Sequence, residues 1–321
     1  RHNGVQAAEL QAAEAAWDRA SKGGGPLENA FARCKQEVLG LAGVDLASFG
    51  ASGARPAPPP PPHVEVHEVR PSLLICGLGG LSVTQVASLL RDHRVARVVV
   101  CGRLGRDAHV RAASEAAEEL GLADQGGAVL VVPVADSASE DIGAHFVTAS
   151  AFISAALGAS ESGKVLVACR QGASRSAAVI MAHLMSSEGV SVLEAFQLLS
   201  SQRWRLWPNA GFVEQLLQLQ ERLAGTAAAA APAAVDRAGT LKAIGAHAAW
   251  ATNRQNLEEG GVGRPGLRLE DAEELWGQAA GRAASAAEAF ELCKAMALGV
   301  DLRAFEAGMG GAEEAGPPAK R

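Results

Sequence analysis

The chain has 321 residues, enough for about two domains, and 48% of them are hydrophobic although only 4% are aromatic. Its net charge is −6, and residues 72–223 carry 12 Lys or Arg against 14 Asp or Glu, so we expect no nucleic-acid partner. Five scattered cysteines, an odd number, indicate a reducing compartment, and no stretch is long and apolar enough to span a membrane. These features favour a cytoplasmic location, with the nucleus as the alternative.

The chain begins with a helical segment and a proline-rich linker. Residues 5–22 alternate Ala with Glu, Gln and Leu, which predicts an amphipathic helix, and we assign residues 1–49 to a small helical module. Residues 50–71 are expected to be a stiff, extended linker. Its segment 56–62 is a candidate motif for an SH3- or WW-type partner, although a plain spacer is favoured. Because the first residue is Arg1 rather than Met, we expect a fragment, which a targeting segment could precede.

Residues 72–223 alternate strand and helix patterns, which predicts an α/β domain. In such sheets, ligands bind beyond the carboxyl ends of the strands. The expected strands are Leu73–Cys76, Ala96–Cys101, Ala128–Val134 and Lys164–Ala168. The expected helices lie within Ser82–Arg91, His109–Leu120, Ile142–Leu157, Ser176–Ser187, Ser191–Gln202 and Asn209–Leu223, the last capped by Asn209.

The loop between the last strand and the next helix has the pattern C-x5-R, formed by Cys169 and Arg175. A loop that leads into a helix directs its backbone amides toward an anion. Gly172 permits a close backbone approach, and the guanidinium of Arg175 can hold two phosphate oxygens. A cysteine in the floor of such a nest is expected to be a thiolate near neutral pH. The sequence therefore predicts a phosphate-binding loop with a nucleophile in its floor.

The remainder of the chain is predicted to be an Ala-rich linker over residues 224–265 and a second helical module over residues 266–310. The two modules share residues at matched spacing, which predicts a duplication that flanks the α/β domain. Trp17, Phe31, Cys34 and Lys35 recur as Trp276, Phe290, Cys293 and Lys294, each 259 positions later, and Gly43–Phe49 recurs as Gly299–Phe305. We interpret the Cys-Lys pair as a buried thiol beside a surface charge, because no cluster of metal ligands stands nearby.

The segment from Cys169 to Phe212 resembles the dual-specificity branch of the cysteine phosphatases nearly throughout. It contains G-x-S-R-S after the cysteine, the A-x-L-M helix, V-S-x-x-E-A-F at a helix start and the turn P-N-x-G-F. The resemblance extends more weakly to about Leu73. It implies the cysteine-phosphatase fold, an α/β architecture with a central, mostly parallel sheet flanked by helices, and hydrolysis of phosphoserine/threonine and phosphotyrosine in proteins. It implies neither a cofactor nor a metal.

Two other functions remain open on this scaffold. The first is a phosphoinositide or phosphoglycan phosphatase, although lipid-directed members often carry additional Lys in the loop. The second is a phospho-binding pseudophosphatase without turnover. Its support is Ala168, because the family nearly always places His before the nucleophile, where it braces the loop.

The chemistry assigns roles to residues of the loop and to residues outside it. Cys169 would attack phosphorus, and Ser176 would assist the departure of the Cys169 sulfur in the second step. Asp136 takes the position of the family's general acid, and Asp141 is interpreted as a carboxylate that holds its own loop. Arg103 and Arg106 follow the second strand and could draw in an anionic substrate, although solvated surface charge is the favoured interpretation. The expected phosphate-binding set is Arg170, Gln171, Gly172, Ala173, Ser174 and Arg175.

Cysteines near the nucleophile raise the question of redox control. An accessible thiolate is oxidised first to a sulfenic acid, which a second cysteine can trap as a disulfide. Cys101 ends the second strand, and some members of the superfamily have a resolving cysteine there. Cys76, at the end of the first strand, is the reserve candidate. An ordinary buried role for Cys101 is weighed equally.

Overall fold

The computed structural model describes residues 64–122, 128–159, 163–226 and 235–300. Every described residue belongs to one compact unit. The predictions for the helical module 1–49 and for the proline-rich segment 56–62 lie outside the described residues. None of the described helices is both long and apolar enough to cross a bilayer.

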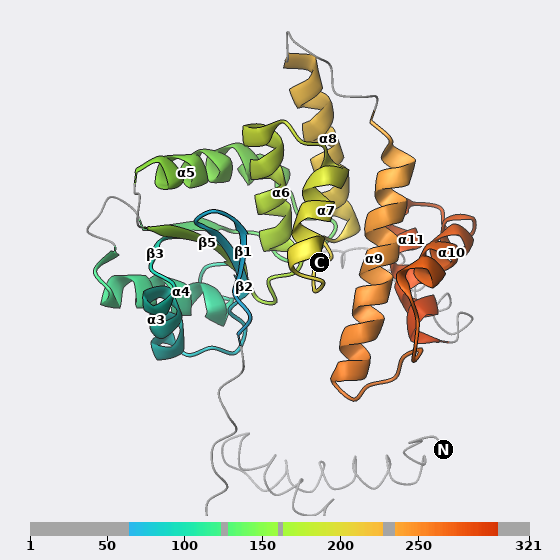
Figure 1. Ribbon diagram of the computed structural model, residues 1–321, viewed down its shortest axis with the longest axis horizontal. Coiled ribbons are helices and arrows are strands. Elements are labelled where there is room, and N and C mark those ends of the chain that lie inside the picture. The colour runs from blue at the N-terminus through green and yellow to red at the C-terminus, as the bar shows by residue number, and fades with distance from the viewer. Residues whose placement is uncertain (1–63, 123–127, 160–162, 227–234, 301–321) are drawn as a thin grey trace, which may run out of the picture. The chain divides into compact units, whose positions relative to one another are not determined.

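A five-stranded sheet with the strand order β1-β2-β5-β3-β4 organises this unit (Figure 1). Parallel pairing joins β2 to β5, β5 to β3 and β3 to β4, whereas β1 pairs antiparallel with β2. The strands are β1 (His67–Arg70), β2 (Leu73–Gly77), β3 (Val95–Cys101), β4 (Val129–Val132) and β5 (Lys164–Cys169). The predicted α/β fold with a mostly parallel sheet is therefore confirmed.

Strand β1 corrects the expected linker over residues 50–71. Its sequence is HEVR, and Val69 is its one buried side chain. A short edge strand that buries a single apolar residue has no detectable alternation, so its pairing with β2 could not be predicted from the local sequence.

Helices cover both faces of the sheet (Figure 1). On one face, Val86 and Val110 of the first two helices join Leu74, Val98 and Leu166 in a buried cluster. Phe146 and Phe212 belong to the larger cluster on the opposite face. The helices of the first face are α3 (Val83–Asp92) and α4 (Ala108–Glu119), and those of the second are α5 (Phe146–Ala159), α6 (Arg175–Glu188), α7 (Val192–Gln202) and α8 (Ala210–Thr226).

Helix ends follow the capping chemistry of the sequence. Ser191 and Glu194 form a capping box at the start of α7. Asn209 Oδ1 accepts a hydrogen bond from the amide of Phe212 at 3.1 Å, so the predicted cap of α8 is confirmed. Helix α6 is followed by Gly189, whose φ of 70° is the left-handed conformation common after a helix.

The Ala-rich segment after α8 contains a helix where we expected a linker. Helix α9 (Arg237–Glu258) has 22 residues and lies within the range 224–265. Its Ile244 is fully buried, and a Cβ at Gly245 would collide with the ring of Trp276. Alanine is the strongest helix former, and small side chains allow helices to approach closely, so the composition that suggested a linker instead suits a packed helix.

Two shorter helices complete the described part of the second module. These are α10 (Leu269–Ala280) and α11 (Ala286–Leu298), which pack with α9 (Figure 1). Trp276 and Phe290 form an edge-to-face pair with ring centroids 5.2 Å apart. Cys293 is fully buried, as the sequence predicted, and burial raises its pKa to about 12. The matching residues of the first module are not described, so the duplication remains a prediction.

Candidate active site

The C-x5-R loop lies at the carboxyl end of β5, which is an interior strand of the sheet, and leads directly into α6. We call residues 169–175 the phosphate loop. Cys169 is 1% exposed at its start, and two hydrogen-bonding groups reach the sulfur. The amide of Gly172 donates to Sγ at 3.2 Å, and the hydroxyl of Ser176 lies 3.2 Å from it. The predicted neighbours Cys169, Gly172 and Ser176 are therefore brought together.

Close packing against β2 shapes the phosphate loop. Gly172 has a φ of 70°, and a Cβ there would lie 2.5 Å from the carbonyl carbon of Cys76. The amides of Leu78 and Gly79 donate to the carbonyls of Cys169 and Arg170, at 2.9 and 2.8 Å. Glycine is thus required at position 172 both by the backbone conformation and by the close approach of the β2 backbone.

Arg175 is held among oxygen acceptors although it is only 6% exposed. Its Nη1 donates to the carbonyl of Val134 at 3.4 Å. Two carboxylates flank it, with Asp136 Oδ2 at 3.8 Å from Nε and Asp107 Oδ2 at 3.9 Å from Nη1. Nε makes no hydrogen bond within the described part of the chain. A buried guanidinium with an unused donor at a loop of amides is suited to an anion.

Asp136 and Asp141 have different surroundings. Asp136 Oδ1 accepts from Ser174 Oγ at 2.6 Å and from Asn209 Nδ2 at 2.9 Å, and the carboxylate faces Arg175. Asp141 Oδ1 accepts from the amide of Ala144 at 3.1 Å, beside the short 3-10 helix that precedes α5. The structure therefore places Asp136 at the phosphate loop and gives Asp141 the loop-holding contact that we expected.

The rest of the predicted phosphate-binding set divides by exposure. Arg170 and Gln171 are exposed, whereas Ala173 and Ser174 are buried. Among the two arginines after β3, Arg106 is exposed, which fits a solvated charge.

Arg103 corrects the expectation of a solvated surface charge. It is half-buried, and its Nε is buried without a hydrogen bond to any described residue. Its amide donates to Asp107 Oδ2 at 2.6 Å, so the loop between β3 and α4 folds back on itself and draws Arg103 inward.

Two residues that support the phosphate loop were not expected from the sequence pattern. One is Asp107, which contacts Arg175 as well as the amide of Arg103. The other is Arg203, 6% exposed, which donates to the carbonyls of Gly172 and Gln171 at 3.2 and 3.1 Å. Burial lowers the pKa of Arg203, and the carboxylate of Glu65 opposes this effect. The position of Asp107 before a helix is a usable signal, but a single Arg at a helix end is not.

Ala168 faces away from the phosphate loop. Its side chain is fully buried and packs with Val100 and Leu166 in the cluster beneath α3 and α4. An apolar side chain therefore fills the position where the family usually has His.

The two cysteines near Cys169 lie on different faces of the sheet. Val100 of β3 is the register partner of Ala168, so Cys101 comes next to Cys169 in the following row. Cys101 belongs to the same buried cluster as Cys169, whereas Cys76 belongs to the cluster on the other face. Burial raises the pKa of Cys76 to about 12 and that of Cys101 well above its usual value. No disulfide links the described cysteines.

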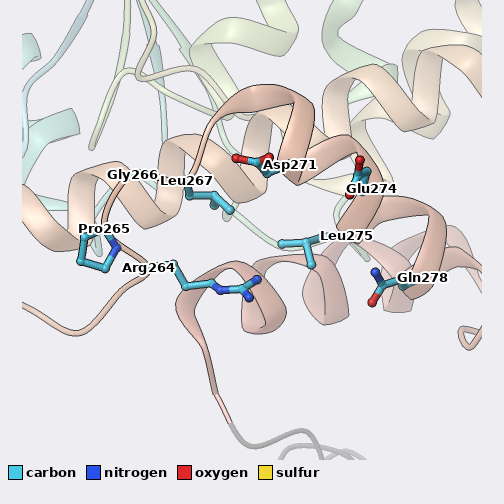
Figure 2. A pocket seen from close by; sticks show the side chains of 8 residues that line it. All are labelled: Arg264, Pro265, Gly266, Leu267, Asp271, Glu274, Leu275 and Gln278. Carbon is cyan, nitrogen blue, oxygen red and sulfur yellow. The ribbon is translucent and has the colours of Figure 1, made fainter.

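Two surface cavities have different relations to this site. One of about 380 Å³ adjoins the phosphate loop, where Arg170, Gln171 and Arg203 meet Gln255 of α9 and Glu259, the residue that follows this helix. The other, of about 390 Å³, is lined by residues of α10 and of the loop before it and includes none from the phosphate loop (Figure 2). Among the described residues, no three or more His, Cys, Asp or Glu side chains gather in a way that could hold a metal ion.

Comparisons with known proteins find relatives for more than half of the chain. A family model described as "Dual specificity phosphatase, catalytic domain" matches residues 107–222. Human dual specificity phosphatase 28 is 36% identical over 177 residues, which cover 55% of this chain and 88% of that protein. Rat dual specificity protein phosphatase 5 is 41% identical over 92 residues, 29% of this chain and 23% of that protein. The crystal structure of human DUSP28 is 33% identical, covers 53% of this chain and 99% of its own, and has a TM-score of 0.39.

The chain therefore belongs to the dual specificity phosphatase family, and it is a protein phosphatase. Helices α9, α10 and α11 follow the matched residues 107–222.

Proposed function

We propose that the chain hydrolyses phosphoserine/threonine and phosphotyrosine in proteins through a cysteinyl-phosphate intermediate. The Cys169 thiolate attacks phosphorus, and the bond between phosphorus and the substrate oxygen breaks. Asp136 gives a proton to the leaving oxygen. Water then attacks the cysteinyl phosphate, Asp136 accepts a proton from it, and the thiolate departs beside the hydroxyl of Ser176.

The phosphate loop supplies the electrostatic part of the proposal. Backbone amides from Arg170 to Arg175 and the guanidinium of Arg175 hold the three equatorial oxygens, where charge spreads in the transition state. The observation that carries the proposal is the meeting of a nucleophile, a buried arginine and a carboxylate at one loop. Cys169 Sγ lies 3.2 Å from the amide of Gly172, and Arg175 Nε lies 3.8 Å from Asp136.

Two competing activities are separated by experiment. Cys169→Ser should abolish release of phosphate from an aryl phosphate while keeping affinity for phosphate, because the loop survives and the thiolate does not. A pseudophosphatase predicts no release by the wild-type chain. A comparison of phosphopeptides with inositol phospholipids then decides between protein and phosphoinositide substrates, and faster hydrolysis of the lipids would contradict the proposal.

The mechanism requires no metal ion. Vanadate, which mimics the trigonal-bipyramidal phosphoryl group, should inhibit the wild-type chain, and EDTA should not. Activity that disappears with EDTA and returns with a divalent cation would refute a cysteinyl-phosphate mechanism.

The remaining proposals concern partners, location and redox control. Residues 56–62 are a candidate proline-rich ligand for an SH3- or WW-type domain, and the location is cytoplasmic, with the nucleus as the alternative. Cys101 is the proposed partner of Cys169 in a reversible disulfide. Their place in one buried cluster, at adjacent ends of β3 and β5, supports Cys101 over Cys76.

A further inference from the structure

The carbonyl side of the phosphate loop is braced by the segment between α7 and α8. We call residues 203–209 the bracing segment. Arg203 donates from Nε to the carbonyl of Gly172 and from Nη2 to that of Gln171, at 3.2 and 3.1 Å. Because the N–H and C=O of a peptide unit point in opposite directions, fixing these carbonyls also fixes the amides on the other side of the loop.

The same segment supports the next two residues of the loop. The amide of Trp207 donates to the carbonyl of Ala173 at 2.9 Å, and the amide of Asn209 donates to Ser174 Oγ at 3.2 Å. Four consecutive residues of the phosphate loop therefore depend on one short segment. The geometry of the loop follows the position of that segment.

Helix α9 holds the bracing segment at Trp204. His247 Nε2 lies 2.9 Å from the carbonyl of Trp204. The indole of Trp250 meets that of Trp204 edge to face at 6.0 Å, and the guanidinium of Arg254 lies 4.2 Å from the centre of the Trp204 ring. Trp204 is the immediate neighbour of Arg203, so this contact is one residue away from the bonds to the phosphate loop.

The imidazole of His247 has one role in this contact. A carbonyl oxygen only accepts, so Nε2 carries the proton and donates. Burial lowers the pKa of His247, which favours the neutral ring. Phe196 of α7 packs edge to face on that ring, with centroids 5.2 Å apart, and Trp250 lies 5.3 Å away. The ring is thus fixed by α7 and α9 together.

We propose that α9 is a positioning element of the active site, acting through His247, which fixes Trp204 and thereby the orientation of Arg203 and Trp207 against the phosphate loop. The proposal rests on the proposed role of that loop. It assigns a function in catalysis to a helix that lies beyond the residues matched by the catalytic-domain model.

His247 is accordingly a positioning residue, because it contacts no group that would touch the phosphate. Loss of its hydrogen bond should make the backbone amides of the phosphate loop less well positioned. Binding of a phosphate group and of the transition state for its transfer should then weaken together. A role in folding alone would lower the thermal stability without this change in binding.

The experiment uses the full chain with three substitutions. His247→Leu removes the donor and keeps a side chain of similar size, whereas His247→Gln places an amide N–H where Nε2 stands. Leu275→Ala is the control for stability, because Leu275 of α10 belongs to the large buried cluster that also contains Ala246 and Ala248 of α9. The measurements are kcat/KM on an aryl phosphate, the affinity for vanadate and the melting temperature.

We expect His247→Leu to lower kcat/KM and the affinity for vanadate by about tenfold, the effect of one lost hydrogen bond. His247→Gln should recover most of both. Leu275→Ala should lower the melting temperature at least as much, yet leave kcat/KM within about twofold at a temperature where the chain is folded.

Unchanged vanadate affinity in His247→Leu would overturn the proposal, as would an equal loss in Leu275→Ala. If His247→Leu does not fold, Arg254→Ala decides, since it removes the guanidinium from the Trp204 ring at an exposed position and should weaken vanadate binding in the same direction. Vanadate binding is read without turnover. Activity that survives Cys169→Ser would therefore refute the proposed mechanism. The inference about α9 would still be judged by the affinity for vanadate.

Discussion

Ser174 of the phosphate loop donates a hydrogen bond of 2.6 Å to Asp136, which lies on the loop after β4. Asn209 Nδ2 donates to the same carboxylate oxygen at 2.9 Å, and the other oxygen faces Arg175. The group proposed to protonate the leaving oxygen is thus oriented by the loop proposed to bind the phosphate. A displacement of the phosphate loop should therefore also displace the Asp136 carboxylate.

Asp136→Asn should lower kcat for phosphopeptides by about 10²–10⁴, because an amide cannot give a proton to the serine, threonine or tyrosine oxygen. The loss should be far smaller for an aryl phosphate whose leaving oxygen departs as a stable anion. Asp141→Asn is the matched control and should stay within about twofold. Equal losses in both variants, or a loss independent of the leaving group, would contradict the role of Asp136.

Asp107 should be required to hold Arg175. Its carboxylate accepts from the amide of Arg103 and lies 3.9 Å from Arg175 Nη1. Asp107→Ala should raise KM for an aryl phosphate by about tenfold, whereas Asp107→Asn, which keeps an oxygen for the Arg103 amide, should cost less. Glu115→Gln, on the exposed surface of α4, is the control. If Asp107→Ala leaves KM unchanged, Arg175 is held without this carboxylate.

Peroxide should join Cys169 to Cys101. Peroxide oxidises the Cys169 thiolate to a sulfenic acid, and the Cys101 thiol then displaces water to form the disulfide. Peptide mapping should find this link, and dithiothreitol should restore activity. Cys101→Ser should make the inactivation irreversible, whereas Cys76→Ser should not, because its side chain lies on the opposite face of the sheet. A Cys76–Cys169 link would reverse this assignment.

Ala168→His should destabilise the chain and should not improve turnover. The family resemblance alone suggests that a His at this position would favour the thiolate form of the nucleophile and so raise turnover. Ala168, however, is fully buried among the apolar side chains of Val100, Leu166 and their neighbours. Overpacking of this kind costs about 1–3 kcal/mol of the free energy of unfolding, measured by denaturant titration. Higher turnover at unchanged stability would show that the cluster has room for an imidazole.

The local sequence was sufficient for the strand, loop and helix that carry the nucleophile. The expected strand Lys164–Ala168 and helix Ser176–Ser187 differ from β5 and α6 by one residue at each shifted end. Periodicity, small residues in the loop and the C-x5-R spacing all predict the same structure there. Asp136 could also be predicted, because the carboxyl ends of parallel strands meet at one edge of the sheet.

The supporting residues could not be predicted in the same way. Arg203 is a polar residue at a helix end, and nothing local indicates that its guanidinium is buried against the carbonyls of the phosphate loop. The linker expected over residues 224–265 rests on the Ala-rich residues 224–239, and most of α9 follows them. The packing of α9 against Trp276 depends on residues far along the chain, which a local pattern does not contain.

Helix α6 is enclosed on all sides as far as Met185, and only its last turn, residues 186–188, is exposed. Its side chains from Arg175 to Met185 are buried without interruption, including the polar Ser176 and His183. A helix with no solvent-facing stripe cannot open locally without breaking the packing of α5, α7 and α8 around it. The backbone amides of this enclosed part should therefore exchange with deuterium only when the whole unit unfolds, so the residues that follow the nucleophile report the global stability of the protein.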